Sequence, residues 1–357
     1  MKHVFKKGTD TITFIIYILM FLSVLPATAQ KKYRYAPAAT GKWTYTYLNE
    51  SKGSYRSDAN YVLSPAELTV FKNKINTVVE TLHQNPVTQS PVGYEATITA
   101  GIFANMYRYK YNVANLKGKI PQAEIILRFC PLHEEIATGK IIKDCMEVEH
   151  CDVFLNSLER TVTLYGSAYE DPAANKNPLD AAASKMNGVF QAPEIFQQPA
   201  PGVTLYTNSV MVFAKPGRPY WLPVTAGEYF DLLIQYWTLQ SEKEGNSLFL
   251  DMLLQEKQKF TEASLQLPAY NGENPASQIT VVPNNRPYMR LNPDFFDKQL
   301  PRTAVQLITV HLNQDILIKG FDPKEYLTGE HYMDFLRYFE YSKAIDVEKI
   351  KALLDIQ

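Results

Sequence analysis

The clearest hydrophobic pattern in the chain runs from Val203 to Gln240. Residues 203–214 are rich in Val, Thr, Tyr and Phe, a composition typical of a half-buried strand. Pro216-Gly217 then favours a turn, because Pro presets one backbone angle and Gly supplies the positive φ that follows, so residues 218–224 can return as a partner strand. From residue 226 onward, apolar side chains recur at helical spacing. The pattern therefore predicts a hairpin followed by an amphipathic helix with one buried face.

Helix starts are marked by capping boxes, in which an N-cap side chain and an acidic residue three positions later bond each other's backbone amides. The pattern occurs at Ser64–Glu67, Thr225–Glu228 and Asp322–Glu325. The first box opens a run of helical apolar spacing that ends near Asn85-Pro86, where Pro cannot continue a helix. Asp346 is expected to cap a last, short helix.

Alternating apolar and polar residues predict strands between these helices. Trp43–Tyr47 alternates aromatic and hydroxyl side chains, so its three rings share one face of a strand. The other runs are 94–103, 106–113, 123–136, 141–156, 159–165, 279–282, 287–291 and 304–313. Helices laid over a meander of antiparallel strands predict an α+β fold, with antiparallel sheets covered by amphipathic helices in two lobes.

Residues 1–29 have the three parts of a secretory signal peptide: a basic front with three lysines, an apolar run and the small-residue cleavage pattern Ala27-Thr28-Ala29. The apolar run is short for a spanning helix, and no Cys at the cleavage point can accept a lipid. We expect cleavage of this signal peptide. The mature protein would then be periplasmic or extracellular, without a transmembrane or lipid anchor.

A change of composition divides the mature chain. Residues 166–202 are rich in Pro, Ala, Asn and Gln, in place of the alternating patterns on both sides. We interpret them as a connector between an N-terminal α+β domain, residues 30–165, and a C-terminal α+β domain, residues 203–357. The 328 residues left after cleavage are enough for two ordinary domains.

Charge narrows the range of partners. Removal of residues 1–29 leaves 33 basic and 36 acidic residues, a net charge of −3. Proteins that bind nucleic acid usually carry an excess of basic residues, so no nucleic-acid partner is expected.

The cysteines and their neighbours could bind a metal, form a disulfide or stay reduced. A zinc site has suitable ligand types, but the spacing argues against it. If residues 123–136 and 141–156 pair as a hairpin, Cys130 and Cys145 lie opposite each other, and an exported protein favours their oxidation. We therefore predict a Cys130–Cys145 disulfide with Cys151 left over, and keep another pairing, or three free thiols, as the alternative. The full cluster is Cys130, His133, Cys145, His150 and Cys151.

A search for catalytic signatures finds no nucleophile elbow, no zinc-protease motif and no phosphate-binding or dinucleotide-binding loop. No catalytic residue, metal or cofactor is therefore indicated. His311 lies in a strand-like run and is the histidine that could best serve as a base. The structural interpretation, a hydrogen-bonded strand histidine, is preferred.

The favoured function is that of a binding or interaction module for a protein or a glycan. Clefts at domain boundaries lined by aromatic residues with a few polar groups are typical binding sites. The loop Asp294–Pro301 and the segment before it could line such a groove. For Tyr220 and Trp221 the alternative is packing beneath the helix that follows. The candidate ligand-binding residues are Arg218, Tyr220, Trp221, Tyr288 and Arg290.

Two other functions are kept as alternatives, a secreted hydrolase of unrecognised type and an envelope scaffold. The segments Leu63–Pro86, Lys215–Trp237 and Arg290–Val310 resemble those of an uncharacterised group of secreted bacterial proteins. The resemblance implies an exported chain and no activity, cofactor or functional residue.

Overall fold

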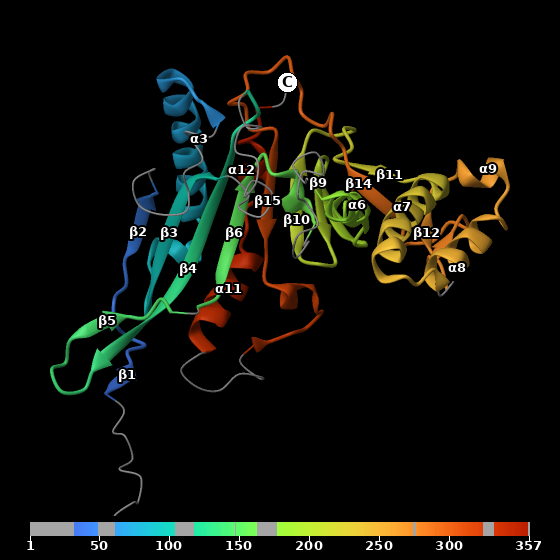
Figure 1. Cartoon of the computed structure of the whole chain (residues 1–357). Coiled ribbons are helices and arrows are strands. Elements are labelled where there is room, and N and C mark those ends of the chain that lie inside the picture. Colours follow the sequence, from blue (N-terminus) through green and yellow to red (C-terminus); the bar gives the residue numbers. More distant parts are fainter. Residues whose placement is uncertain are drawn as a thin grey trace, which may run out of the picture.

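The computed structural model describes residues 32–48, 61–103, 118–146, 148–162, 177–273, 276–323 and 332–355. A ten-stranded sheet runs through the larger lobe (Figure 1). All its pairings are antiparallel except that of β2 with β3. In spatial order the strands are β2 (Trp43–Tyr47), β3 (Tyr94–Phe103), β4 (Gln122–Glu135), β6 (His150–Leu155), β15 (Leu307–His311), β10 (Val210–Ala214), β9 (Val203–Tyr206) and β8 (Ile195–Ala200), with β1 (Tyr33–Tyr35) and β5 (Ile141–Lys143) paired to β4.

Helices pack on the strands of this sheet. Helix α3 (Pro65–His83) contacts β3, α11 (Tyr332–Lys343) contacts β4 and β6, and α12 (Val347–Lys351) contacts β8 and β10; the short α4 (Pro86–Gln89) follows α3. Every second residue of the central strands joins the core, as expected for strands whose side chains alternate between two faces. Four fully buried side chains lie at the centre of this core: Phe71, Ile98, Phe129 and Tyr341.

A smaller lobe lies to the right in Figure 1. It holds α6 (Pro178–Asn187), α7 (Ala226–Glu244), α8 (Leu248–Lys257), α9 (Glu262–Leu265), the sheet β11 (Trp221–Pro223), β14 (Tyr288–Leu291), β7 (Val189–Gln191), and the pair β12 (Tyr270–Asn271) and β13 (Ile279–Thr280). Phe230, Leu253 and Tyr288 belong to its core. A separate cluster around Trp221 and Leu307 joins a strand of each lobe.

The predicted α+β class is confirmed, with antiparallel sheets covered by amphipathic helices. Residues 30–165 and 203–357, predicted as two domains, both contribute strands to the large sheet, because β15 lies between β6 and β10. Residues 177–202, the described part of the predicted connector, contain α6, β7 and β8. Among the described residues, none of the helices has the length and apolar character needed to cross a membrane.

The predicted hairpin around Pro216-Gly217 is wrong. Residues 203–214 fold back on themselves as β9 and β10, with a turn that includes Ser209 at a φ of +62°. The other edge of β10 is occupied by β15, so residues 218–224 cannot pair there. They form β11 instead, which pairs with β14.

Two further strand predictions need correction. The run 141–156 is divided into β5 and β6 by a turn in which the Met146 amide donates to Asp144 Oδ1 over 3.0 Å. The predicted strand 159–165 begins instead inside a 3₁₀ helix, Leu158–Thr161, and a second 3₁₀ helix spans Gln314–Leu317. The predicted strand 106–113 and most of the third capping box lie outside the described residues.

The two described capping boxes are confirmed. At the start of α7 the Glu228 amide donates to Thr225 Oγ1 over 3.2 Å, and the Thr225 amide donates to Glu228 Oε2 over 3.0 Å. Ser64 and Glu67 make the same pair of bonds at the start of α3, and Asp346 caps α12.

We expect Thr225→Ala to lower the free energy of unfolding by about 1 kcal/mol, because it removes the acceptor for an amide at the helix start. Ser247→Ala is the matched control, since the Ser247 hydroxyl at the start of α8 makes no capping hydrogen bond. Urea unfolding of both variants measures the difference. An equal loss in the two variants would contradict the assignment of the stabilising bond to Thr225.

A buried carboxyl group in the smaller lobe makes stability depend on pH. Glu256 is 3% exposed and accepts a hydrogen bond from the Ser277 hydroxyl. Its second oxygen has no partner among the described residues. Burial raises the pKa of Glu256 above its usual value of 4.5, with the Ser277 hydrogen bond opposing the shift. The folded protein therefore holds this proton more tightly than the unfolded chain does.

The contribution of protonated Glu256 to the free energy of unfolding should be fully present below the pKa that Glu256 has in the unfolded chain. It should be lost as the pH rises through the pKa that Glu256 has in the folded protein. Glu256→Gln, which cannot ionise, should be more stable than wild type at pH 7 and should lose this part of the pH dependence. Thermal unfolding from pH 4 to 8 tests this, with the exposed Glu262→Gln as control. A wild-type protein more stable than Glu256→Gln throughout that range would refute the shift.

Candidate binding cleft

A cleft of about 810 Å³ lies where the large sheet meets the end of β14. One wall comes from the start of β4 and the turn after β6, and the opposite wall from Leu291 and the residues that follow it. This volume lies within the range of about 300–1,000 Å³ that is usual for ligand pockets. The side chains used below are Tyr61, Lys119, Gln122, Asn156, Glu159, Asn292, Phe296 and Lys298.

Asn156 forms the floor of the cleft and is 1% exposed. Its φ of +56° reverses the chain directly after β6, a conformation that Asn tolerates better than most residues. Its amide nitrogen donates to the carbonyl oxygen of Ala304 over 2.9 Å and to that of Pro121 over 3.3 Å. Its Oδ1 accepts from the Gln306 amide over 2.8 Å. One side chain therefore joins the ends of β4, β6 and β15.

The loop that forms the opposite wall is fixed by a second buried amide, Gln306, which is 4% exposed. Its Oε1 accepts from the Asp297 backbone amide over 2.7 Å, and its Nε2 donates to the Asp297 carbonyl oxygen over 3.1 Å. At the start of the loop, Asn292 Nδ2 donates to the Pro219 carbonyl oxygen over 2.7 Å. These bonds hold Phe296 and Lys298 at the cleft without using their side chains.

Arg302 holds the backbone at Tyr61, a residue that lines the cleft. Its guanidinium donates to Glu67 Oε1 over 2.6 Å and to the carbonyl oxygens of Tyr61 and Val62 over 3.3 and 2.8 Å. The hydrogen bond from Arg302, followed by those from Ser64, lowers the pKa of Glu67 to about 2. The first turn of α3 and the buried Tyr61 beside the cleft are thus held by one ion pair.

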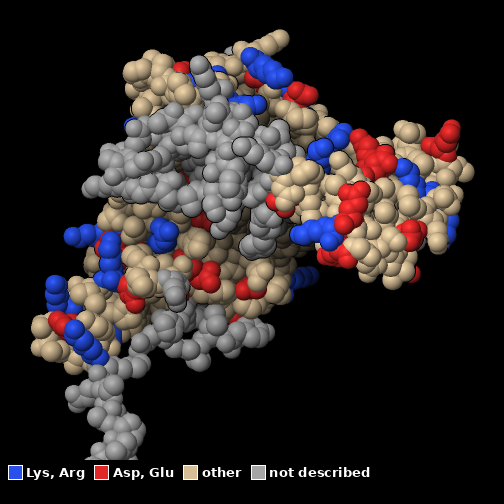
Figure 2. Space-filling model, viewed as in Figure 1, with Lys and Arg blue, Asp and Glu red and all other residues tan. Residues whose placement is uncertain are grey.

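The polar groups of the cleft suit hydrogen bonding more than charge neutralisation. Gln122 is 8% exposed, and its Oε1 has no partner among the described residues. Lys119 and Lys298 contribute positive charge, Glu159 contributes a carboxylate that accepts from the Ser157 hydroxyl over 3.2 Å, and Phe296 contributes a half-buried ring. On the face shown in Figure 2, acidic and basic side chains of the described residues are intermixed.

Two of the sequence-predicted ligand residues lie in separate cores. Trp221 is 6% exposed, and its Nε1 donates to Thr161 Oγ1 over 2.7 Å. Tyr288 is 4% exposed and packs at 4.5 Å from the ring of Tyr229, with which it shares the core under α7. Both side chains face protein atoms. Trp221 is packed, but in the cluster with Tyr206 and Leu307 and not beneath α7, where the packing alternative had placed it.

The other three are less buried. Arg218 Nη1 lies 3.4 Å from Asp297 Oδ2, and Arg290 Nη1 lies 3.4 Å from Glu228 Oε1. The Tyr220 hydroxyl is hydrogen-bonded to that of Tyr206. The five residues therefore do not form one surface. Only Arg218 lines a described cavity, on the far side of the loop that carries Phe296.

Part of the cleft could be predicted from the sequence. The loop Asp294–Pro301 was expected to line a groove, and Phe296 and Lys298 do so. Asn156 was missed, although an Asn-Ser pair directly after an apolar strand is a turn signal. Nothing in the sequence marked Gln122 and Gln306 as buried residues of the cleft, because a Gln at the start of a strand is usually exposed.

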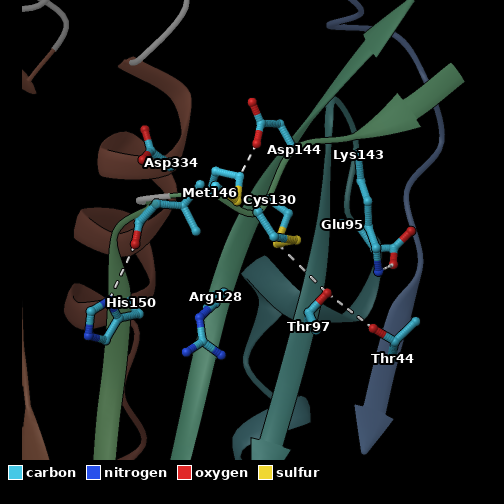
Figure 3. The surroundings of a disulfide bond; sticks show 12 residues. Thr44, Glu95, Thr97, Arg128, Cys130, Lys143, Asp144, Met146, His150 and Asp334 are labelled. Carbon is cyan, nitrogen blue, oxygen red and sulfur yellow. Dashed lines mark hydrogen bonds and ion pairs between the residues drawn. A yellow bond between two sulfur atoms is a disulfide. The ribbon is translucent and has the colours of Figure 1, made fainter.

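The structure joins Cys130 and Cys145 in a disulfide, as predicted (Figure 3). The pairing follows from the register of β4 and β5, in which Leu132 lies opposite Lys143 and the Asp144 amide donates to the Pro131 carbonyl oxygen over 3.0 Å. The chain after β5 is thereby carried back along β4 to Cys130.

Cys151 is the leftover thiol, also as predicted, and it is buried in the main core. Burial raises the pKa of this thiol, which makes it a poor nucleophile. Among the described residues, no group of three or more His, Cys, Asp or Glu side chains is placed to hold a metal ion.

His311 makes the contacts of a structural strand residue. Its Nε2 lies 3.0 Å from the Arg160 carbonyl oxygen, so Nε2 carries the proton and donates it. Burial lowers the pKa of His311 and favours the neutral ring. A second histidine, His150, has its Nε2 3.5 Å from Asp152 Oδ2, and the hydrogen bond that its ring donates to this carboxylate raises the pKa of His150.

Comparisons of the chain with protein-family models, with curated proteins and with solved structures found no match. The resemblance to uncharacterised secreted proteins stays a prediction, and the function has to be argued from the cleft.

We expect reduction of the disulfide to lower the free energy of unfolding by about 3 kcal/mol, the loop-entropy value for its sequence separation of 15. Urea unfolding with and without a reductant measures the loss. The double variant Cys130→Ser/Cys145→Ser is the control and should not respond to the reductant. If wild type and the double variant responded alike, the bond would have to be assigned elsewhere.

Proposed function

We propose that the protein is an exported, non-catalytic binding protein that takes a short segment of glycan into the cleft of about 810 Å³. Two features support export: the signal-peptide pattern of residues 1–29, and the Cys130–Cys145 disulfide, since disulfides persist in oxidising compartments.

The observation that carries the proposal is the buried acceptor Gln122 Oε1 at the cleft. A buried carbonyl oxygen without a donor costs roughly 1–3 kcal/mol, so a bound group that donates a hydrogen bond gains that amount. No described residue supplies this donor. Because this oxygen is buried in the free protein, the Gln122 side chain has to rotate toward the cleft before a ligand hydroxyl can donate to it; the lone pairs of that hydroxyl can then accept from lysine.

Sugar hydroxyls suit this cleft better than a strongly charged ligand does. Lys119 and Lys298 are opposed by Glu159 in the cleft and by Asp294, which lies 3.2 Å from Lys298 Nζ. A polyanion would gain little from so balanced a site. The apolar CH face of a sugar ring can pack on Phe296, as aromatic side chains supply contact area at low entropic cost.

The carboxylate count supports binding over glycan cleavage. Glycosidases of both common types use a pair of carboxyl groups on either side of the scissile bond. Among the described residues that line this cleft, Glu159 is the carboxylate, and its partner Ser157 is a hydroxyl. A binding site needs no second one.

The test uses the mature chain, residues 30–357, with chitotriose, cellotriose and maltotriose as neutral probes in isothermal titration calorimetry. At least one should bind. Phe296→Ala and Gln122→Leu should each weaken binding by about tenfold, from lost ring contact and a lost acceptor. Phe196→Ala is the matched control, because Phe196 is 47% exposed on β8 and lies outside the cleft.

Equal affinity in Phe296→Ala, Gln122→Leu and Phe196→Ala would place the binding site elsewhere. Absence of binding to all three trisaccharides, together with binding to a random peptide library, would replace the glycan by a protein partner. Release of shorter sugars during the titration would show that the protein is a hydrolase.

A further inference from the structure

An arm of the larger lobe projects from its body, at the lower left of Figure 1. It consists of the end of β4 with β1 paired to one edge and β5 to the other. A turn joins β4 to β5, and in it the Gly139 amide donates to the Glu135 carbonyl oxygen over 2.8 Å. Residues 136–141 at this turn are all exposed. We call these six residues the tip of the arm.

Two branched apolar side chains stand at the tip. Ile136 opens the turn and is 54% exposed, and Ile141 is the first residue of β5 and is 44% exposed. Single apolar residues on a protein surface are common and need no partner. A pair on either side of one projecting turn is different, because both side chains can enter an apolar surface together without any change in the sheet.

The charged side chains next to the tip are paired with one another. Lys32 Nζ lies 3.6 Å from Glu135 Oε1. Arg34 Nη2 donates to Glu134 Oε1 over 3.0 Å and to Glu134 Oε2 over 2.9 Å. These matched charges give the arm little attraction for a partner of either sign. Its contribution to binding is therefore the apolar surface of the two isoleucines.

The place where residues 1–31 join the described chain indicates which surface the tip meets. The Ile136 amide donates to the Lys32 carbonyl oxygen over 3.1 Å, so Lys32 lies beside the tip. The apolar run of the expected signal peptide ends at Leu25. Even a fully extended chain spans at most about 25 Å from Leu25 to Lys32. While the signal peptide is attached and lies in the membrane, the tip is thus kept close to the membrane surface.

We propose that the tip docks on the phospholipid membrane across which the chain is exported, with Ile136 and Ile141 in the headgroup region of the lipids. The driving force is the removal of apolar surface from water. Two half-exposed side chains give a weak and reversible contact. Attachment of the signal peptide raises the local concentration of the membrane, so the contact is occupied before cleavage. The inference rests on the export in the proposed function and does not involve the glycan cleft.

Flotation of the mature chain, residues 30–357, with vesicles tests the docking. One set of vesicles is phosphatidylcholine alone, and the other is an equal mixture with phosphatidylglycerol. The chain should bind both sets with little effect of salt, because the contact is apolar. Ile136→Ser/Ile141→Ser should weaken binding by about tenfold or more. The matched control is Ile195→Ser/Ile318→Ser, since these side chains are 56% and 53% exposed and lie outside the arm.

The proposal fails if the mature chain binds neither set of vesicles, or if the two double variants bind equally well. Binding to the anionic vesicles alone, abolished by salt, would also overturn it, because charged groups would then make the contact. Sedimentation without lipid tests a second copy of the chain: self-association that only the tip variant loses would put that copy in place of the membrane. If the double tip variant does not fold, as judged by circular dichroism, Ile136→Ser takes its place. Trisaccharide binding should be the same in the tip variant, so the cleft and the tip can fail separately.

Discussion

The left-handed turn at Asn156 is the constraint on which both the large sheet and the cleft depend. After β6 the chain has to leave the sheet so that β15, about 150 residues later, can take the place beside it. The Asn156 side chain fills the resulting gap between strand ends with four hydrogen bonds to backbone groups. Buried backbone groups without such partners would each cost roughly 1–3 kcal/mol. The same side chain is the floor of the cleft, so the fold and the candidate site share one element.

The loop from Asn292 to Leu300 separates two cavities of different character. The Gln306 side chain makes hydrogen bonds to the loop backbone at Asp297. The side chains of the loop are not needed for this support, and they alternate between the cleft and the smaller cavity. The cleft side offers amides, a ring and balanced charge, whereas the other side is lined by Lys215, Arg218 and the ion-paired Asp297. A rigid support with adaptable side chains is the arrangement that binding sites generally need, because little order has to be gained when a ligand binds.

The disulfide stabilises a part of the molecule that has little core of its own. The β4–β5 hairpin, with β1 beside it, extends away from the body of the larger lobe (Figure 1). Without the disulfide, β5 could separate from β4, because few buried contacts hold this hairpin. Cys151 lies opposite Leu127, and its side chain belongs to the main core. Cys130 Sγ lies outside that core, 3.8 Å from the Thr97 hydroxyl. The free thiol and the disulfide are therefore kept apart in the folded protein and cannot exchange.

The sequence by itself determined what depends on neighbours along the chain. The capping boxes at Ser64 and Thr225, the helices that follow them, and the pairing of Cys130 with Cys145 all rest on contacts within about 20 residues, where spacing fixes geometry. The α+β class and the involvement of the loop after β14 followed from the same local patterns.

Only the tertiary structure decided which strands meet. The insertion of β15 between β6 and β10 displaced β11 from the predicted hairpin, and no local pattern encodes which distant strand occupies an edge. Trp221 is buried beside Leu307 of β15, and Tyr288 is buried in the core under α7; in the sequence, such aromatic rings suit a core and a binding surface equally well. The insertion of β15 also brought Gln122 and Asn156 to the cleft. A polar side chain is assigned to a site by what surrounds it, and those surroundings come from parts of the chain more than a hundred residues away.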